Sequence, residues 1–330
     1  MRIAVIGAGA WGTALAQVAI GAGDAILWAR EKEVAAEVDA DHENTSFLPG
    51  IRLDPKLRAT GDLGEATKGA EAVLLVVPAQ FLRRVARDLA RTLAAGVPVV
   101  LCAKGIEATS GALMTEVAAE TLPRNPLAVL SGPSFAHEVA KGLPTALVIA
   151  SAVDGLAETM ATRLARPTFR LYVSDDPVGA EIGGAVKNVL AIAAGIVEGA
   201  GLGDNARAAM ITRGLAEMIR LGNALGARPG TLSGLAGMGD LVLTCTGASS
   251  RNHRLGVALG KGQTVAEATS GSRAVVEGVA SAHPVRARAK SLGVEMPLVE
   301  AVDDVVNAGL SVREAMQRLL GRPPKAEVWS

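Results

Sequence analysis

Short runs of apolar residues alternate with helical patterns through the first half of the chain. Each run is continuously hydrophobic, as expected for parallel strands that are covered on both faces. Strands that alternate with helices in this way are typical of a doubly wound α/β sheet. The expected strands span residues 2–6, 25–28, 72–77, 97–101, 128–130, 146–149 and 169–173. We therefore predict an α/β domain with a parallel sheet over residues 1–180.

The pattern changes near residues 174–177, and from Glu181 onward the apolar positions follow a helical period interrupted by turns. The expected helices span residues 181–199, 206–225, 251–259, 275–292, 298–308 and 312–319. The sequence thus predicts an all-α second domain over residues 181–330. Ligands of open α/β sheets bind at the carboxyl ends of the strands, so we expect the site to lie between the two halves.

A glycine-rich turn connects the first expected strand to the first helix. The sequence GAGAWG occupies residues 7–12, directly after the run 2–6. In such a motif Gly7 permits the tight turn, Gly9 lets the backbone approach a pyrophosphate, and Gly12 lets helix and strand pack closely. The unpaired N–H groups at the start of the helix then face the anion. The context predicts a dinucleotide site in a Rossmann-type domain.

The tip of the second strand bears on the choice of dinucleotide. An NAD-selective domain places Asp or Glu there to bind the ribose 2′-hydroxyl, whereas this chain has Ala29 and Arg30. A guanidinium can pair with a 2′-phosphate through its planar fork, which favours NADP(H). Glu31 follows at once and a small register change would bring it to the ribose, so NAD(H) stays open. Arg30 as a solvated loop cation is the alternative.

Composition excludes several other classes of protein. The 330 residues are 49% hydrophobic and 2% aromatic, and 33 Lys and Arg balance 33 Asp and Glu. Without net charge or a basic block, we expect no nucleic-acid partner. Cys102 and Cys245 are too few for a metal site or a disulfide framework, and we assign no metal ligand among the histidines. Glycines divide the apolar stretch 3–23, so we expect no signal peptide or membrane insertion and a cytoplasmic location.

Lys187 lies in the expected helix 181–199 among small apolar residues. Such a lysine either extends its ammonium to the surface or is held desolvated for proton transfer, in which case burial lowers its pKa. Asn188 beside it either serves the same site or is satisfied by water. The sequence leaves both choices open.

Three further segments combine polar residues with glycines or strand ends. Lys104 directly follows an expected strand, in the segment 102–107, where it either binds a ligand at the edge of the sheet or is a strand-end lysine in solvent. In the segment 131–136 a strand ends in a turn that opens a helix, whose N–H groups could hold a phosphate, although Ser134 as a plain helix cap fits equally well. The segment 249–254 gathers hydroxyls and two arginines at an expected helix start, which suits a phosphate pocket or a charged surface cap.

Together these segments resemble the bacterial-type NAD(P)-dependent glycerol-3-phosphate dehydrogenases, and the resemblance covers nearly the whole chain. The motifs that carry it, by order and spacing, lie at residues 7–12, 102–107, 130–136, 186–188, 237–241 and 250–252. The resemblance implies interconversion of dihydroxyacetone phosphate and sn-glycerol 3-phosphate with NADP(H) or NAD(H), which supplies glycerophospholipid synthesis. A homodimer is compatible with the Ala- and Gly-rich helical half.

The resemblance also implies roles for individual residues. Lys187 would be the proton donor and acceptor at the carbonyl oxygen, with Lys104 and Asp240 completing the catalytic set. Lys104 would depress the pKa of Lys187 and Asp240 would raise it, so the sequence does not give the net shift. The implied cofactor residues are Gly7, Gly9, Ala10, Trp11, Gly12, Arg30, Lys104, Ala136, Arg251, Val275 and Glu277. The implied substrate residues are Lys104, Gly132, Ser134, Lys187, Asp240, Thr244, Ser250, Arg251 and Asn252.

Two other functions are compatible with parts of this pattern. A β-hydroxyacid or 6-phosphogluconate type of dehydrogenase also carries a lysine on the first helix of an all-helical domain. The segment Ser250-Arg251-Asn252, starting ten residues after Asp240, favours glycerol phosphate instead. A non-catalytic NADPH-binding sensor would keep residues 7–12 but would not need Lys187.

Overall fold

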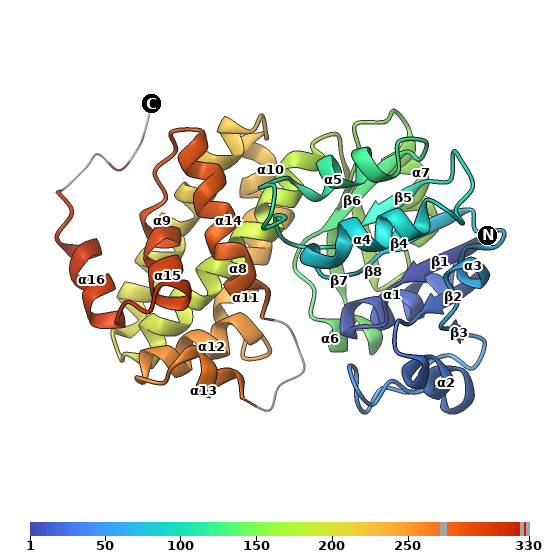
Figure 1. The fold of residues 1–330 in the computed structure, drawn as a ribbon, viewed down its shortest axis with the longest axis horizontal. Coiled ribbons are helices and arrows are strands. Elements are labelled where there is room, and N and C mark those ends of the chain that lie inside the picture. The colour runs from blue at the N-terminus through green and yellow to red at the C-terminus, as the bar shows by residue number, and fades with distance from the viewer. Residues whose placement is uncertain (271–275, 324–326, 328–330) are drawn as a thin grey trace.

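One eight-stranded sheet organises the first half of the protein (Figure 1). The computed structural model describes residues 1–270, 276–323 and 327. The strands follow the spatial order β3-β2-β1-β4-β5-β6-β7-β8, with β1 at the point where the order reverses. Their bounds are β1 Arg2–Ile6, β2 Asp24–Trp28, β3 Arg58–Thr60, β4 Ala72–Leu75, β5 Val99–Leu101, β6 Leu127–Ser131, β7 Thr145–Ala150 and β8 Phe169–Ser174.

The sheet confirms the doubly wound architecture but not a wholly parallel arrangement. β1 pairs in parallel with both β2 and β4, and the parallel pairing continues to β6. β7 runs antiparallel to β6, with Leu130 opposite Ile149, and β8 is again parallel to β7. The apolar run in β7 reports burial on both faces, and burial does not fix the direction of a strand. The short strand β3 carries no such run and was not predicted.

Helices cover both faces of the sheet. On one face α1, α6 and α7 share a core with the strands, which includes Leu15, Val139 and Met160. On the other face α4 and α5 bury Leu82 and Val117 against the sheet. The helices of this half are α1 Ala10–Ile20, α2 Lys32–Asp41, α3 Leu63–Thr67, α4 Ala79–Leu89, α5 Met114–Thr121, α6 Ala136–Ala140 and α7 Leu156–Leu164.

The second half is helical, as predicted, and is built around the long helix α8 (Figure 1). α8 spans Pro177–Gly199 and packs against α9, α11, α12 and α14. It is long and apolar enough to cross a membrane, but 94% of its most apolar window is buried inside the protein, as in a core helix. The other elements are α9 Gly203–Ala224, α10 Pro229–Ser233, the π-helix η1 Leu235–Gly239, α11 Asp240–Thr246, α12 Arg251–Gly260, α13 Val265–Thr269, α14 Glu277–Ser291, α15 Pro297–Asn307 and α16 Val312–Leu320.

Glycines let the backbone of α8 touch that of its neighbours. A Cβ atom on Gly195 would overlap the carbonyl oxygen of His253 in α12, and one on Gly256 of α12 would overlap the carbonyl oxygen of Ile192. Helices that approach this closely need small residues at the crossing. The contact brings the start of α12 beside the middle of α8, where Lys187 lies.

Candidate active site

The glycine-rich turn has the shape that a dinucleotide requires. Gly7 adopts a φ of +119°, and a Cβ atom on Gly12 would overlap the carbonyl oxygen of Gly7. At Gly9 a Cβ atom would meet nothing within 4 Å, so this glycine leaves open space beside the start of α1. Gly9 is also the N-cap of α1 and offers no side-chain acceptor to the helix N–H groups. The turn therefore fits a bound pyrophosphate.

Trp11 gives a second indication of a ligand at this turn. Its indole N–H is buried and has no hydrogen-bond partner in the part of the chain that the structure describes. Buried donors in proteins are nearly always paired, so an unpaired one next to an open turn points to a missing partner. Ala10 and Trp11 pack beside the same core as Ala136, which begins α6.

The tip of β2 holds a cation and an anion together. The Nε atom of Arg30 donates to a carboxylate oxygen of Glu31 at 2.9 Å, and the two side chains are 60% and 37% exposed. The structure thus leaves Arg30 accessible for a 2′-phosphate, with Glu31 within reach of the same position. Both sequence alternatives for this tip stay open.

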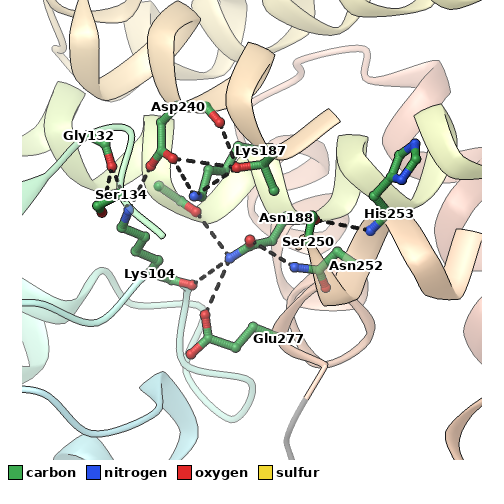
Figure 2. Close-up of polar contacts among 12 residues, drawn as sticks. Lys104, Gly132, Ser134, Lys187, Asn188, Asp240, Ser250, Asn252, His253 and Glu277 are labelled. Atoms are coloured by element: carbon green, nitrogen blue, oxygen red, sulfur yellow. Dashed lines mark hydrogen bonds and ion pairs between the residues drawn. The ribbon is translucent and has the colours of Figure 1, made fainter. Parts of the chain in front are cut away.

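Lys187, Lys104 and Asp240 meet at one buried point (Figure 2). Lys187 Nζ lies 2.5 Å from Asp240 Oδ1, and Lys104 Nζ lies 2.7 Å from Asp240 Oδ2. Asp240 is fully buried, and the lysine side chains are 8% and 13% exposed. Lys187 also donates to Thr244 Oγ1 at 3.0 Å, and Thr244 donates to the main-chain oxygen of Asp240 at 2.6 Å. One carboxylate thus orients two ammonium groups.

Burial determines the sign of the net shift at Lys187. Desolvation lowers the pKa of Lys187, the charge of Asp240 raises it, and the charge of Lys104 lowers it; together they bring it to about 8. This answers the question that the sequence left open: Lys187 is desolvated rather than extended to the surface. A lysine that titrates near neutral pH can both give and take a proton during turnover.

A π-helix brings Asp240 to Lys187. η1 ends at Gly239, and Asp240 begins α11 directly after it. A Cβ atom on Gly183 of α8 would overlap the carbonyl oxygen of Ala236, so η1 lies directly on the helix that carries Lys187. π-Helical turns are rare and occur often at functional sites.

The end of β6 supplies the opposite wall. Gly132 has a φ of +134°, and its carbonyl oxygen accepts from Lys104 Nζ at 2.9 Å and from Ser134 Oγ at 3.1 Å. Ser134 and Lys104 therefore share the carbonyl oxygen of Gly132 as acceptor, and the substrate role of Ser134 stays a prediction. Ser131, just before this turn, has a buried hydroxyl without a partner among the described residues, and the sequence reading did not single it out.

Asn188 connects the two halves of the site (Figure 2). Its Nδ2 donates to the main-chain oxygen of Lys104 at 3.3 Å and contacts Glu277 Oε2 at 3.4 Å. Its Oδ1 accepts from Asn252 Nδ2 at 2.9 Å, and Asn252 Oδ1 accepts from the N–H of Gly278 at 2.9 Å. Protein groups occupy the hydrogen-bonding atoms of the Asn188 side chain. The alternative in which water satisfies them is therefore wrong. The Asn252 amide is likewise held by the protein on both sides.

The expected phosphate segment forms the start of α12. Ser250 is its N-cap, and the hydroxyl accepts from the N–H of His253 at 3.2 Å. Arg251 is exposed. Burial raises the pKa of Glu277, and the charge of Arg251 is the largest effect that opposes this rise. Arg251, Lys187 and Lys104 thus all act on the same buried carboxylate, Glu277.

The comparisons with known proteins agree over almost the whole chain. The N-terminal part of the NAD-dependent glycerol-3-phosphate dehydrogenase family matches residues 2–157, and its C-terminal part matches residues 176–317. The chain belongs to this family. It is 58% identical over 328 residues to a glycerol-3-phosphate dehydrogenase [NAD(P)+] of Rhodospirillum rubrum, covering 99% of this chain and 94% of the relative. It is 55% identical to one of Parvibaculum lavamentivorans, covering 99% and 98%.

A solved structure of the family has the same fold. The crystal structure of glycerol-3-phosphate dehydrogenase from Coxiella burnetii matches with a TM-score of 0.93 at 42% identity, covering 97% of this chain and 99% of that one. Family membership confirms the resemblance and excludes the β-hydroxyacid and 6-phosphogluconate alternatives.

The individual roles of the glycerol-3-phosphate dehydrogenase site stay predictions, although most of the residues are now placed. Lys104, Gly132, Ser134, Lys187, Asp240 and Thr244 gather at one point. Ser250 and Asn252 use their side chains within the protein, so any contact with a substrate phosphate has to share those groups. Val275, an expected cofactor residue, lies outside the described residues.

Proposed function

We propose that this protein catalyses the reversible, NAD(P)H-dependent reduction of dihydroxyacetone phosphate to sn-glycerol 3-phosphate, and so supplies glycerophospholipid synthesis. The observation that carries the proposal is the buried contact of Lys187 with Asp240 beside Lys104, in a chain of this family. The relatives named above are called dehydrogenases, which supports catalysis over a non-catalytic sensor.

The residues of the site fit the chemistry of carbonyl reduction. A nicotinamide held in this site would supply the hydride that the carbonyl carbon of the substrate needs. The oxygen gains negative charge as this happens, and the Lys187 ammonium stabilises that charge and donates its proton to the oxygen. Asp240 and Thr244 hold Lys187 Nζ in position. In the reverse direction neutral Lys187 takes the proton from the hydroxyl.

Charge at the site favours a phosphorylated substrate. Lys104 and Lys187 against Asp240 leave a net positive charge, and Arg251 adds a guanidinium near Glu277. Arginine binds phosphate through its fork of N–H donors. We assign the phosphate to Arg251 with Ser250 and Asn252, and the hydroxyl-bearing end of the substrate to Lys104, Gly132 and Ser134.

We assign the cofactor to the turn at residues 7–12 and the tip of β2, with Ala136, Lys104, Arg251, Val275 and Glu277 nearer the nicotinamide. Both NADP(H) and NAD(H) are accepted, because Arg30 can bind a 2′-phosphate and Glu31 a 2′-hydroxyl. The exposed guanidinium supports a preference for NADP(H).

We also propose that the two domains meet at residue 180, that the protein is cytoplasmic and that it forms a homodimer. The sheet ends at Ser174 and α8 begins at Pro177, which supports a boundary close to residue 180. Light scattering of the purified protein measures the oligomeric state, and a mass of one chain would refute the dimer.

Loss of nicotinamide absorbance on mixing the protein with dihydroxyacetone phosphate tests the function. Rapid oxidation of NADPH, and slower oxidation of NADH, is the expected result. Lys187→Met should lower turnover at least several hundredfold while NADPH binding persists, since general acid catalysis supplies about 10²–10⁴-fold. Unphosphorylated dihydroxyacetone is the control. Equal use of both substrates would refute the phosphate assignment, and no oxidation with either cofactor would refute the function.

A further inference from the structure

A buried carboxylate joins the catalytic helix to the segment that carries Lys104. Glu181 of α8 is 3% exposed, and its two oxygens accept from the N–H and the hydroxyl of Thr115 at 2.8 and 2.6 Å. Thr115 is the second residue of α5. The N-cap residue of α5 is Leu113, whose side chain has no hydrogen-bond acceptor. Glu116 of α5 accepts from the N–H of Leu113 at 2.7 Å. Glu181, far along the chain, supplies the acceptor for the next free donor, the N–H of Thr115.

The same face of α8 touches the Lys104 segment at two further points. A Cβ atom on Gly184 would lie 3.1 Å from Lys104 Cγ, so the stem of this lysine lies directly against α8. Asn188 donates to the main-chain oxygen of Lys104 (Figure 2). Residues 181, 184 and 188 are spaced by three and four, which places them on one helical face. Residues 104–115 thus dock along a single stripe of the helix that carries Lys187.

The apolar side chains of this segment agree with that docking. Ile106 and Leu113 are buried in the same core as Ile182 and Ala185 of α8, rather than in either core of the sheet. They also form an antiparallel bridge with each other, which closes the loop between Lys104 and α5. Gln80 and Arg83 of α4 bind the same loop from the side of the sheet, through Ile106, Ala108 and Glu107. The loop therefore bridges the two halves of the protein, and Glu181 supplies the hold from α8.

We propose that Glu181 is a positioning residue, which holds residues 104–115 on α8 so that Lys104 and Lys187 share Asp240. This role for catalysis rests on the proposed function. Loss of the Glu181 contact frees the start of α5 and the adjoining loop, and Lys104 then moves away from Asp240. Misplacement of a catalytic group by about 1 Å can cost on the order of 10²-fold in rate.

A second buried carboxylate provides a matched control. Glu217 of α9 is 2% exposed, and its oxygens accept from the N–H groups of Leu298 and Val299 at 2.7 and 3.2 Å. These residues begin α15, whose N-cap residue Met296 likewise has no side-chain hydrogen bond. Burial raises the pKa of Glu181 and of Glu217 to about 7 alike. Both carboxylates are buried and accept two hydrogen bonds at a helix N-terminus, but α15 carries none of the expected site residues.

The test compares Glu181→Ala, Glu181→Gln and Glu217→Ala in steady-state kinetics and thermal unfolding. Glu181→Ala should lower kcat/KM for dihydroxyacetone phosphate by about 10- to 100-fold, with the KM for NADPH within about threefold of wild type. Glu181→Gln should restore most of the loss, because its amide can accept from the Thr115 N–H and donate to the Thr115 hydroxyl. Glu217→Ala should lose similar thermal stability yet keep its kcat/KM.

The pH dependence of the reduction rate gives a second measurement, which a loss of thermal stability alone would not change. Lys104 lowers the pKa of Lys187, so its displacement in Glu181→Ala should move the fall in reduction rate from about pH 8 to higher pH. Equal activity of Glu181→Ala and Glu217→Ala, with unchanged pH profiles, would overturn the proposal. If Glu181→Ala does not fold, Thr115→Val removes only the hydroxyl contact and should show the same effects at smaller size.

Hydrogen exchange separates this proposal from the function itself. Amides of residues 102–115 should exchange at least about tenfold faster in Glu181→Ala than in wild type, and Glu217→Ala should accelerate residues 297–307 instead. An inactive wild-type enzyme would refute the proposed function while exchange still tests the docking. Unchanged exchange at 102–115 in Glu181→Ala would overturn the docking, whatever the activity.

Discussion

Asp240→Asn should shift the pH dependence of catalysis rather than lower it uniformly. Protonated Lys187 donates the proton in reduction, so the reduction rate should be high below its pKa of about 8 and fall above it. Oxidation of glycerol phosphate needs neutral Lys187 and should rise through the same pH. The groups around Lys187 act in both directions: Asp240 raises the pKa, whereas burial and Lys104 lower it. Removal of the carboxylate charge therefore lowers the pKa further.

The contact distances set the size of the effect. Asp240 lies 2.5 Å from Lys187 Nζ and is fully buried. A charge this close changes a pKa by about 1–3 units, so the break should move from about pH 8 to roughly pH 5–7. At about pH 7.5 the protonated fraction of Lys187, and with it the reduction rate, then falls about 3- to 200-fold. At about pH 5.5 the same calculation leaves a loss of about fourfold or less.

The assay is kcat for reduction at saturating NADPH, measured from about pH 5 to 9. Asp303→Asn is the control, because Asp303 is also buried in an ion pair, with Arg286 at 3.1 Å, but lies on α15. Loss of the buried Asp240 carboxylate charge should destabilise the fold by about 3–5 kcal/mol. The loss in Asp303→Asn should be smaller, because Arg286 is 36% exposed and also pairs with Asp304. Only Asp240→Asn should change the pH at which the reduction rate begins to fall. A loss of activity that is the same at every pH would refute the electrostatic role of Asp240.

Three further predictions follow from single contacts. Arg251→Ala should raise the KM for dihydroxyacetone phosphate at least about tenfold with little change in kcat, and an unchanged KM would remove Arg251 from the phosphate site. Arg30→Ala should lower the kcat/KM ratio of NADPH to NADH, whereas Glu31→Ala should raise it by freeing the guanidinium; parallel initial rates measure both. Glu181→Gln should match wild type in thermal midpoint near pH 5 and exceed it near pH 8. Burial raises the pKa of Glu181 to about 7 in the folded protein, above its pKa in the unfolded chain. Glu181 therefore stabilises the fold fully at a pH below the unfolded pKa, and this stabilisation is lost as the pH rises through 7. A calorimetric difference independent of pH would contradict this.

Local chemistry made the dinucleotide turn and the helical half predictable. Between a strand and a helix, the glycines of residues 7–12 are typical of a dinucleotide turn, and the structure gives each the expected geometry. Lys187 stood out because an ammonium among small apolar residues needs an explanation. The resemblance then supplied Lys104 and Asp240, which lie 83 residues before and 53 residues after it in the sequence and which no spacing rule connects to it.

Contacts between distant segments were not predictable from the sequence. The direction of β7 depends on its pairing with β6, which its composition does not record. Ser250 and Asn252 matched a phosphate motif, but the structure shows that their polar atoms also hold α12 to itself and to Asn188. Glu181 opened an expected helix as an ordinary polar residue. Its side chain binds the N-terminus of α5, a helix that was not predicted from the sequence.

The small residues of α8 explain how a chain with 2% aromatic residues can desolvate a lysine. Bulky side chains often exclude water from such a group, whereas here glycines on α8 let neighbouring segments pack close to the helix. Gly183 admits η1, Gly184 admits the stem of Lys104, and Gly195 admits α12. Backbone has fewer accessible conformations than a side chain that bridges two helices, so these contacts fix the distances from Lys187 to Asp240 and to the start of α12. Glycines weaken an isolated helix, but in α8 they allow the close contacts that define the position of the helix in the site.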